Sequence, residues 1–542
     1  MSIPQHSHGL SRRTALRWVA GATTTLGLSA ATTTAYAEEQ NHTAEEQPQP
    51  TLVEQFLSQE QFVIAHRGAG DVNPEHSAYA YQQAILKGAQ AVEISVRTTA
   101  DGELVCMHDN ALRRTTTEKT GYVSTSTLAE VKRPLIDMRD FLGPNTPLVH
   151  ITTLEEALGV ILATEAGGPY QSVGGSAVLF IEAKDSAGQP KLLELLTARG
   201  MQDQVVIKMF RNGKGEFDGN NGFIRYAKEA GFTTWCYFDA HDSFEDIAQL
   251  ASSDNVDMLG VPFFETVIGR TESSMSDEKI SQIINLGKPV IVWETHRRWV
   301  QEHFASLGVR GFMSPDPFWL SGRTTSPNLA LEQGRRLHGM LPAGQQDVVN
   351  LPRWENGELV HQQAYDDSIL LGPLAHRTST ADSYVINFTM QWKDALPQTT
   401  WQYGYLAFGR EDDSAFGIAA KFDTTNSRGG GYIVAIRPGA SVIDENGAYV
   451  SGDVVQLLRV DAGSAHLTPL VTLRPRTPFV AGEDIRGKII VRPSNIIIDV
   501  AGARSTPIAD TTYRGAYVHF GRYQDAAHGG ALALSNVVTY KI

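Results

Sequence analysis

The chain has little cysteine and no excess of basic residues. Its 542 residues include only two cysteines, Cys106 and Cys236. A secreted fold held by several disulfides is therefore excluded, and two buried thiols on strands are expected. Lysine and arginine number 46 against 60 aspartates and glutamates, which gives a formal net charge of −14. Because a nucleic-acid-binding protein needs a basic face, we expect no nucleic-acid partner.

Outside its first residues the chain also lacks an apolar run long enough to span a membrane. The first 37 residues have the pattern of an export signal: Arg12 and Arg13 precede a mild apolar run, and a small-x-small cleavage site ends at Ala37. The paired arginines resemble a twin-arginine signal. We predict a secreted protein with no transmembrane anchor once residues 1–37 are removed, and a polar leader at 38–50.

From about residue 51 the chain alternates short apolar runs with helical stretches. The apolar runs are Phe62–Ala65, Ala91–Val96, Val178–Ile181, Val205–Ile207, Thr233–Phe238, Met258–Val261, Pro289–Trp293 and Gly311–Met313. Apolar strands that alternate with helices predict a parallel sheet buried on both faces. Eight such units predict an α/β fold, a (β/α)8 TIM barrel over 51–321. A doubly wound open sheet is the alternative, which the absence of a Gly-rich dinucleotide turn disfavours.

A second pattern follows a connector rich in Ser, Thr, Pro, Gly and Gln, placed at 322–350. Strand-like segments then occur without an intervening helix: Tyr384–Trp392, Tyr403–Gly409, Phe416–Phe422, Gly431–Ile436, Val454–Val460, Lys488–Arg492, Ile496–Val500, Gly515–Phe520 and Val537–Ile542. They predict an all-β sandwich or jelly roll at 351–542. This module resembles a concanavalin-type, lectin-like jelly roll, so a glycan partner is a hypothesis for it, with no residue assigned.

Polar side chains stand where several of the predicted barrel strands end. In chain order these residues are His66, Arg67, Glu93, His108, Glu182 and Lys184. His108 follows a hairpin built on Asp101 and Gly102. Because the carboxyl ends of parallel strands meet at one rim of a barrel, we expect these side chains to converge.

Two histidines, two cations and two carboxylates in one place suit the cleavage of a phosphodiester. One histidine can accept a proton from the nucleophile while the other protonates the leaving alkoxide. An arginine and a lysine can neutralise charge on the phosphate. Carboxylate oxygens are hard ligands, so a metal held by the glutamates is expected to be Ca²⁺ or Mg²⁺. Lys208, at the end of the fourth strand, is either a further cation of the rim or a solvated lysine. His296, Arg297 and Arg298 either reach an anionic head group or form an exposed charge run, and we expect the exposed run.

The order and spacing of these motifs resemble those of the glycerophosphodiester phosphodiesterase family. The segments that carry the resemblance are Phe62–Gly68, Asn73–Ser77, Val92–Val96, Asp101–Asp109, Thr153–Leu158, Ile181–Lys184 and Gly311–Pro317. The resemblance covers about Phe62 to Trp319 and implies a TIM barrel. It implies an acid–base role for His66 and His108, phosphate binding by Arg67 and Lys184, metal binding by Glu93 and Glu182, a supporting role for Glu75, and a place in the pocket wall for Trp293.

The resemblance also implies a reaction. A hydroxyl of the substrate's own glycerol attacks phosphorus and expels an alcohol, and water then opens the cyclic phosphate to give glycerol 3-phosphate. The expected substrate is a small glycerophosphodiester or a glycerophosphate polymer of the cell envelope. Two alternatives stay open: a phospholipase D-like enzyme that acts on lysophospholipids, and a catalytically degenerate envelope protein that binds glycans.

One position departs from the family's pattern. The family's metal motif is Glu-x-Asp, whereas this chain has Ser95 two residues after Glu93, which removes one formal negative charge. Three interpretations follow. The metal is held more weakly by the two glutamates and water; another carboxylate, such as Glu75 or Asp109, takes the missing place; or the barrel binds its ligand without turning it over. Because both histidines and both cations are present, we expect a working enzyme.

Overall fold

The computed structural model describes residues 49–542 apart from 163–174, 212–221, 267–268, 271–273, 323–333, 339, 343–351, 362–367, 375–378, 380, 417–427, 465 and 524–529. The predicted export signal at 1–37 lies outside the described residues, as does most of the strand expected at Phe416–Phe422. Within the described part of the chain, no helix combines the length and the apolar character that a membrane span requires.

Eight parallel strands form a closed barrel. They are β1 (Phe62–Ala65), β2 (Ala91–Thr98), β6 (Val178–Ala183), β7 (Val205–Phe210), β8 (Thr233–Tyr237), β9 (Met258–Pro262), β12 (Val290–Trp293) and β13 (Gly311–Ser314). Each strand pairs in parallel with its neighbours, and β1 pairs with both β13 and β2, which closes the ring. The predicted (β/α)8 barrel is confirmed, and its closure excludes the open-sheet alternative.

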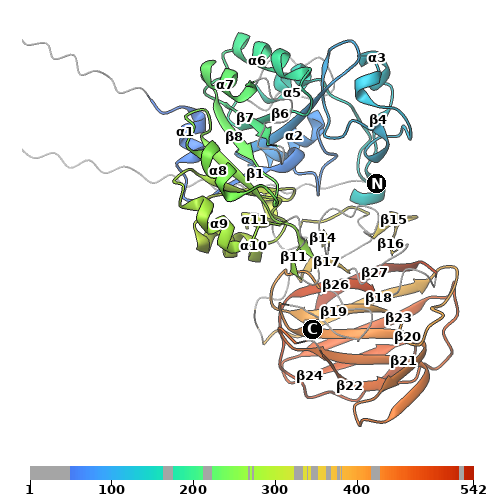
Figure 1. Ribbon diagram of the computed structural model, residues 1–542. Coiled ribbons are helices and arrows are strands. Elements are labelled where there is room, and N and C mark those ends of the chain that lie inside the picture. The colour runs from blue at the N-terminus through green and yellow to red at the C-terminus, as the bar shows by residue number, and fades with distance from the viewer. Residues whose placement is uncertain are drawn as a thin grey trace, which may run out of the picture. The chain divides into compact units, whose positions relative to one another are not determined.

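Helices surround these strands (Figure 1). They are α1 (Leu52–Leu57), α2 (Ala78–Leu86), α5 (Leu154–Ile161), α6 (Gly188–Ala198), α7 (Phe223–Glu229), α8 (Phe244–Ala251), α9 (Asp277–Ile284), α10 (Arg298–Leu307) and α11 (Pro317–Leu320). Several begin at a serine or threonine whose side chain accepts a hydrogen bond from a free backbone N–H of the first turn, as Ser77 does for α2 and Thr153 for α5. These caps mark the sequence positions at which the chain turns from loop to helix.

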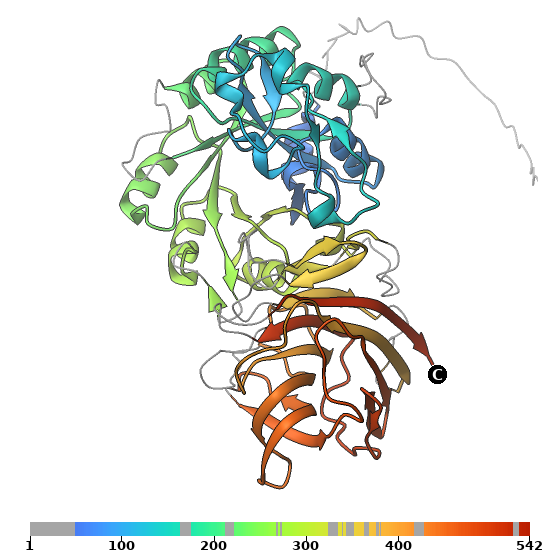
Figure 2. The ribbon, with the colours of Figure 1, turned by 90° about the vertical axis from the view of Figure 1, so that its right-hand side faces the viewer.

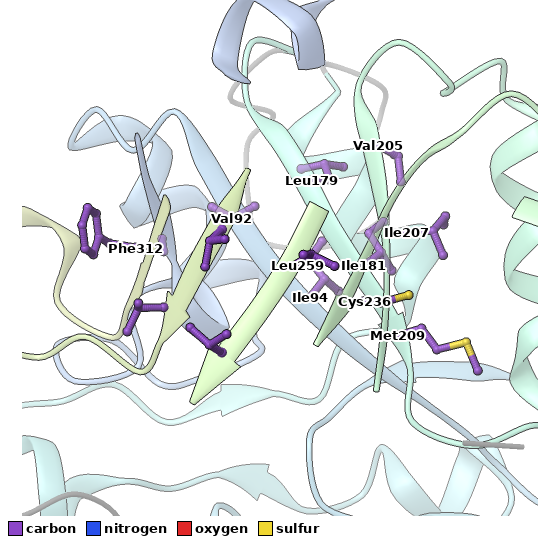
Figure 3. Close-up of a cluster of buried hydrophobic side chains, with 14 of the residues drawn as sticks. Val92, Ile94, Leu179, Ile181, Val205, Ile207, Met209, Cys236, Leu259 and Phe312 are labelled. Atoms are coloured by element: carbon purple, nitrogen blue, oxygen red, sulfur yellow. The ribbon is translucent and has the colours of Figure 1, made fainter. Parts of the chain in front are cut away.

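Alternation along the strands separates two sets of side chains. On β2 and β6, Val92, Ile94 and Ile181 belong to the large core shared with the surrounding helices (Figure 3). The residues between them point into the barrel, where Phe180 and Trp235 form part of a second core. On β2, β6 and β7 the inward positions nearer the carboxyl ends carry polar groups: Glu93, Ser95, Glu182 and Lys208. Strand periodicity therefore delivers charged side chains to one end of the barrel.

An antiparallel strand, β3 (Leu104–Cys106), extends β2 at the rim. The tight turn that joins them contains Gly102 at φ +83°, a value that glycine adopts without strain. The predicted hairpin is thus present, and it delivers His108 to the rim. Cys106 on β3 and Cys236 on β8 are both buried free thiols, as predicted.

The segment after His108 forms a small excursion with its own apolar core. Its elements are η2 (Leu112–Arg114), η3 (Val123–Thr125), α3 (Leu128–Val131), β4 (Leu135–Ile136), α4 (Arg139–Leu142) and β5 (Val149–His150). The excursion returns Arg114 to the barrel rim, where it pairs with Glu75.

The C-terminal part contains two seven-stranded antiparallel sheets (Figure 2). One has the order β14 (Leu341–Pro342), β17 (Ser368–Pro373), β26 (Tyr517–Tyr523), β19 (Tyr403–Arg410), β20 (Gly431–Ile443), β21 (Tyr449–Val460), β22 (Leu467–Leu473). The other has the order β15 (Arg353–Glu355), β16 (Glu358–His361), β27 (Leu532–Lys541), β18 (Tyr384–Trp392), β23 (Ile485–Arg492), β24 (Asn495–Val500), β25 (Ala503–Arg504). Side chains of both sheets share one apolar core, which confirms the predicted β-sandwich.

The expected exposed charge run after β12 is wrong, because none of its three residues is fully exposed. Arg297 is buried, with 1% of its surface exposed, and its guanidinium donates to the backbone carbonyl of Asp413. The carboxylate of Asp413 accepts from the backbone N–H groups at the start of α10. His296 is also largely buried, beside Asp71. Sequence alone cannot distinguish such buried cations from solvated ones, because their partners lie far away in the chain.

Candidate active site

The turn that follows β1 positions His66 and Arg67. It forms a short helical turn, η1 (His66–Gly68), in which Arg67 has φ 57° and Gly68 has φ 75°. A Cβ on Gly68 would lie 2.9 Å from the Cβ of Ala80, so the close approach of α2 also requires glycine here. The turn buries the imidazole of His66 at the mouth of the barrel, with only 5% of the residue exposed.

His66 has a different partner at each ring nitrogen. Its Nδ1 lies 3.6 Å from Oε1 of Glu294, and its Nε2 accepts a hydrogen bond of 3.3 Å from Nε of Arg67. These partners assign the proton to Nδ1 and leave Nε2 with its lone pair. Burial lowers the pKa of His66 to about 4, so the imidazole is neutral near pH 7 and can accept a proton.

His108 is oriented by the carboxylate next to it. Its Nδ1 lies 2.9 Å from Oδ1 of Asp109, whose Oδ2 pairs with Nε of Arg114 at 2.5 Å. An N–H on Nδ1 directed at Asp109 leaves Nε2 free for proton transfer. Burial, and then the charges of Arg67 and Lys184, hold the pKa of His108 well below its usual value. The second histidine is therefore also neutral in the free protein.

Glu75 joins the two arginines of the site. Its carboxylate accepts from Nη1 of Arg67 at 3.2 Å and from Nη1 and Nη2 of Arg114 at 2.9 and 2.6 Å. Burial alone would raise the pKa of Glu75, but the two guanidinium groups outweigh it and hold the pKa far below the usual range. Glu75 is thus an anion that fixes the position of Arg67, which agrees with the supporting role expected from the sequence.

The two glutamates expected to bind a metal form a cluster with two lysines. Oε1 of Glu93 lies 3.1 Å from Nζ of Lys208, and Oε2 of Glu182 lies 3.0 Å from Nζ of both Lys208 and Lys184. Oε1 of Glu182 accepts a 2.6 Å hydrogen bond from the hydroxyl of Tyr237. Burial would raise the pKa of both carboxyl groups, but these cations lower it, so both are ionised.

These residues do not fit a divalent cation as the structure places them. Among the described residues, no group of three or more His, Cys, Asp and Glu side chains is arranged to hold a metal ion. The ammonium of Lys208 lies between the two glutamates, and Ser95 donates its hydroxyl to Oε1 of Glu93 at 2.8 Å. Neither candidate replacement carboxylate joins them, since Glu75 pairs with arginines and Asp109 with His108 and Arg114.

A cavity of about 1750 Å³ opens above this cluster. Its cationic wall includes Arg67, Arg97, Arg114, Lys184 and Lys208, and both His66 and His108 line it. Its apolar wall includes Trp293, whose ring meets those of Tyr237 and Phe264 edge-on at 5.3 and 5.5 Å. The cavity therefore combines positive charge for an anion with an aromatic surface for a less polar group.

The structure brings all of the predicted site residues to one end of the barrel. It adds four residues to which sequence reasoning gave no role or an open one: Lys208, Tyr237, Glu294 and Arg114. Tyr237 ends β8, Glu294 directly follows β12, and Lys208 lies within β7, so position on a barrel strand was a usable signal for these three. Arg114 comes from the excursion after His108, and no feature of the sequence points to it.

The protonation of His296 makes the free energy of unfolding depend on pH. Its Nδ1 lies 3.2 Å from Oδ2 of Asp71, and its Nε2 lies 3.3 Å from Oε2 of Glu294. Burial would lower the pKa of His296, but the two carboxylates outweigh burial and raise it to about 9. In the unfolded chain the pKa is about 6.5. The folded state therefore binds the proton more tightly, and the resulting stabilisation is present below pH 6.5 and lost as the pH rises through 9.

We expect His296→Asn to lower the free energy of unfolding at pH 6 by on the order of 3 kcal/mol, because the shift of the pKa is large and the group is buried. The difference from the wild type should shrink steadily between pH 6.5 and 9. Denaturant unfolding at a series of pH values measures it, with the exposed His241 replaced by asparagine as the control. A difference that stays constant with pH would contradict the assignment of a charged His296.

Comparison with known proteins relates part of the barrel to a family. Residues 66–211 match the model of the Glycerophosphoryl diester phosphodiesterase family. The chain is 49% identical over 82 residues to "Probable glycerophosphodiester phosphodiesterase 1" of Mycobacterium tuberculosis, which covers 15% of this chain and 30% of that protein. It is 31% identical over 156 residues to the glycerophosphodiester phosphodiesterase of Bacillus altitudinis, which covers 28% of this chain and 58% of that protein.

The aligned regions thus span between about a third and three fifths of these relatives. Among solved structures, the chain is similar to an Oleispira antarctica phosphodiesterase in complex with sn-glycerol-3-phosphate. That match has a TM-score of 0.37 and 21% identity, and it covers 48% of this chain and 95% of the other. A glycerophosphodiester phosphodiesterase from Thermotoga maritima matches with a TM-score of 0.35 and 18% identity, over 49% of this chain and 98% of the other.

Proposed function

We propose that the protein is a phosphodiesterase that hydrolyses glycerophosphodiesters to glycerol 3-phosphate and an alcohol. The observation that carries this proposal is the pair His66 and His108. Both are neutral, a carboxylate lies beside Nδ1 of each, and both line one cavity with Arg67 and Lys184. The family of residues 66–211 and the names of the relatives support the same substrate class.

In the proposed first step, a glycerol hydroxyl of the substrate attacks phosphorus. His66 accepts the hydroxyl proton at Nε2, the new O–P bond closes a cyclic phosphate, and the bond to the alcohol breaks. His108 gives the alkoxide its proton. The anionic substrate favours protonation of one imidazole, and Asp109, 2.9 Å from Nδ1, stabilises the imidazolium of His108.

In the second step the roles reverse. His108 takes a proton from water, which attacks the cyclic phosphate, and His66 returns a proton to the glycerol oxygen that leaves phosphorus. Arg67 and Lys184 bind the non-bridging oxygens and neutralise the charge that develops there. The aromatic wall at Trp293 accommodates the alcohol group.

We further infer that the protein acts outside the cytoplasm, because its first 37 residues have the composition of a twin-arginine export signal. A glycerophosphate polymer of the envelope is then an accessible substrate. A glycan partner for the β-sandwich stays a prediction for which no residue is assigned.

A product assay over a panel of substrates tests the proposed function. Purified protein is incubated with glycerophosphocholine, glycerophosphoethanolamine, an oligomeric glycerophosphate and lysophosphatidylcholine, and glycerol 3-phosphate and free alcohols are quantified. We expect glycerol 3-phosphate from the soluble diesters, its loss in His66→Asn, and unchanged rates in His241→Asn. Preferred cleavage of lysophosphatidylcholine would favour the lipid-cleaving alternative, and the absence of turnover on every substrate would overturn the enzymatic proposal.

A further inference from the structure

Lys208 occupies a position that the barrel dictates. It lies on β7, where Val205, Ile207 and Met209 face the outer core, so Lys208 points into the barrel. β7 is the parallel neighbour of β6, which carries Glu182. Only 5% of Lys208 is exposed, so the ammonium has left bulk water and needs compensating partners.

Those partners form a complete cage. The ammonium lies 3.1 Å from Oε1 of Glu93 and 3.0 Å from Oε2 of Glu182. It also lies over the rings of Trp235 and Tyr237, at 5.5 and 4.9 Å from their centres, which is the arrangement of a cation–π contact. Two carboxylates and two aromatic faces therefore surround one ammonium.

Ser95 adds a further contact to this arrangement. Its hydroxyl donates to Oε1 of Glu93, the same oxygen that faces Lys208. An aspartate at this position would place a third carboxylate against Glu93, and its repulsion would require more positive charge than one ammonium supplies. The neutral serine removes that requirement.

The net charge is the same for the family's metal site and for the cluster of Glu93, Glu182 and Lys208. A Glu-x-Asp motif with a further glutamate has three negative charges, and a divalent ion leaves one. Glu93 and Glu182 have two negative charges, and the ammonium of Lys208 also leaves one. Because Ser95 removes one carboxylate, a cation with one positive charge fewer leaves the net charge of the site unchanged.

We propose that Lys208 replaces the divalent metal ion of this barrel site as a built-in cation. It neutralises Glu93 and Glu182 and presents positive charge to the substrate phosphate beside Lys184. Turnover then needs no divalent ion. The catalytic part of this inference rests on the proposed function, whereas the part that concerns metal binding does not.

Metal binding by the full-length protein is the first test. We expect calorimetric titration with Ca²⁺, Mg²⁺ and Mn²⁺ to detect no saturable binding that depends on Glu93, so the wild type and Glu93→Gln should give the same result. Elemental analysis should find no stoichiometric metal. We expect glycerophosphocholine turnover in EDTA to stay within about twofold of its value in added metal. A stoichiometric ion lost in Glu93→Gln, or activity abolished by EDTA and restored by Ca²⁺ or Mg²⁺, would overturn the inference.

The double variant Ser95→Asp/Lys208→Ala supplies the converse test. It removes the ammonium and adds a carboxylate, so we expect a saturable Mn²⁺ site by electron paramagnetic resonance that the wild type lacks. Lys208→Met alone should lower kcat/KM by about 100-fold, a loss typical of a removed electrostatic group. Lys191→Met, which alters a partly exposed lysine on α6 outside the cavity wall, is the matched control and should retain full activity.

The two proposals fail in distinguishable ways. If no substrate is turned over, the titrations still decide whether Lys208 or a metal occupies the cluster. If Lys208→Met does not fold, the wild-type titrations and the EDTA assay decide alone. Full activity of a folded Lys208→Met variant would contradict the catalytic role of Lys208. Equal Mn²⁺ binding by the wild type and the double variant would contradict the replacement of a metal ion by Lys208.

Discussion

Replacing His108 with asparagine should lower kcat for glycerophosphocholine by about 10³-fold, and His66→Asn should lower it by a similar factor. Asparagine retains a hydrogen-bonding amide but cannot exchange a proton near neutral pH. A carboxylate lies beside Nδ1 of each histidine, Glu294 for His66 and Asp109 for His108, and both carboxylates remain in the asparagine variants. Steady-state kinetics with quantified glycerol 3-phosphate measures the effect, and KM should change far less than kcat.

The double variant tests whether the two histidines act in the same chemical steps. Because acid and base act in the same steps, His66→Asn/His108→Asn should lose no more than about tenfold beyond either single variant. His241→Asn, on an exposed loop, serves as the control for a histidine outside the cavity. A kcat within tenfold of the wild type in either single variant would show that the altered histidine does not transfer the proton.

Arg67→Met should lower kcat/KM by about 10² to 10³-fold, because it removes a preorganised cation from the phosphate site. Glu75 holds the guanidinium from one side, so little reorganisation is needed when substrate binds. Arg67→Lys should restore only part of the loss, since a lysine supplies the charge without the planar pair of donors. The split between kcat and KM shows how much of the contribution arises in the transition state.

Arg225→Met is the matched control for this series. Arg225 lies on α7, pairs with Glu229 and takes no part in the cavity wall. Equal activity of Arg67→Lys and the wild type would show that charge alone suffices there. Full activity of Arg67→Met would remove Arg67 from the phosphate site.

The barrel was predictable because each of its strands is buried on both faces. All eight apolar runs correspond to barrel strands, from Phe62–Ala65 to Gly311–Ser314. The same reasoning located the site, since residues that end parallel strands must meet at one rim. This rule alone brings His66, Glu93 and Glu182 together.

The β-sandwich was predicted as a class but not strand by strand. β15, β16, β17 and β22 have no counterpart among the expected segments. Three of them precede Tyr384–Trp392, in a stretch of the sequence where apolar and polar residues do not alternate over a long segment. Their pairing is set by distant partners, such as β26 for β17 and β27 for β16. Such contacts leave little trace in a local pattern.

The role of Lys208 shows where sequence reasoning stops. Alternation along Val205–Phe210 predicts that Lys208 faces the barrel interior, but only the register of β6 and β7 brings it to the glutamates. Glu294 and Arg114 depend in the same way on contacts between segments far apart in the chain. Residue identity and strand position predicted which groups gather, whereas tertiary contacts decide which charge pairs with which.

A ³¹P NMR time course on glycerophosphocholine with the purified protein tests the central claim most directly. We predict that the diester resonance declines, that a cyclic phosphate resonance rises and falls, and that glycerol 3-phosphate accumulates in equal amount to the choline released. His66→Asn should leave the diester resonance unchanged over the same time. A stable diester with the wild-type protein, or phosphocholine as the product, would contradict the account.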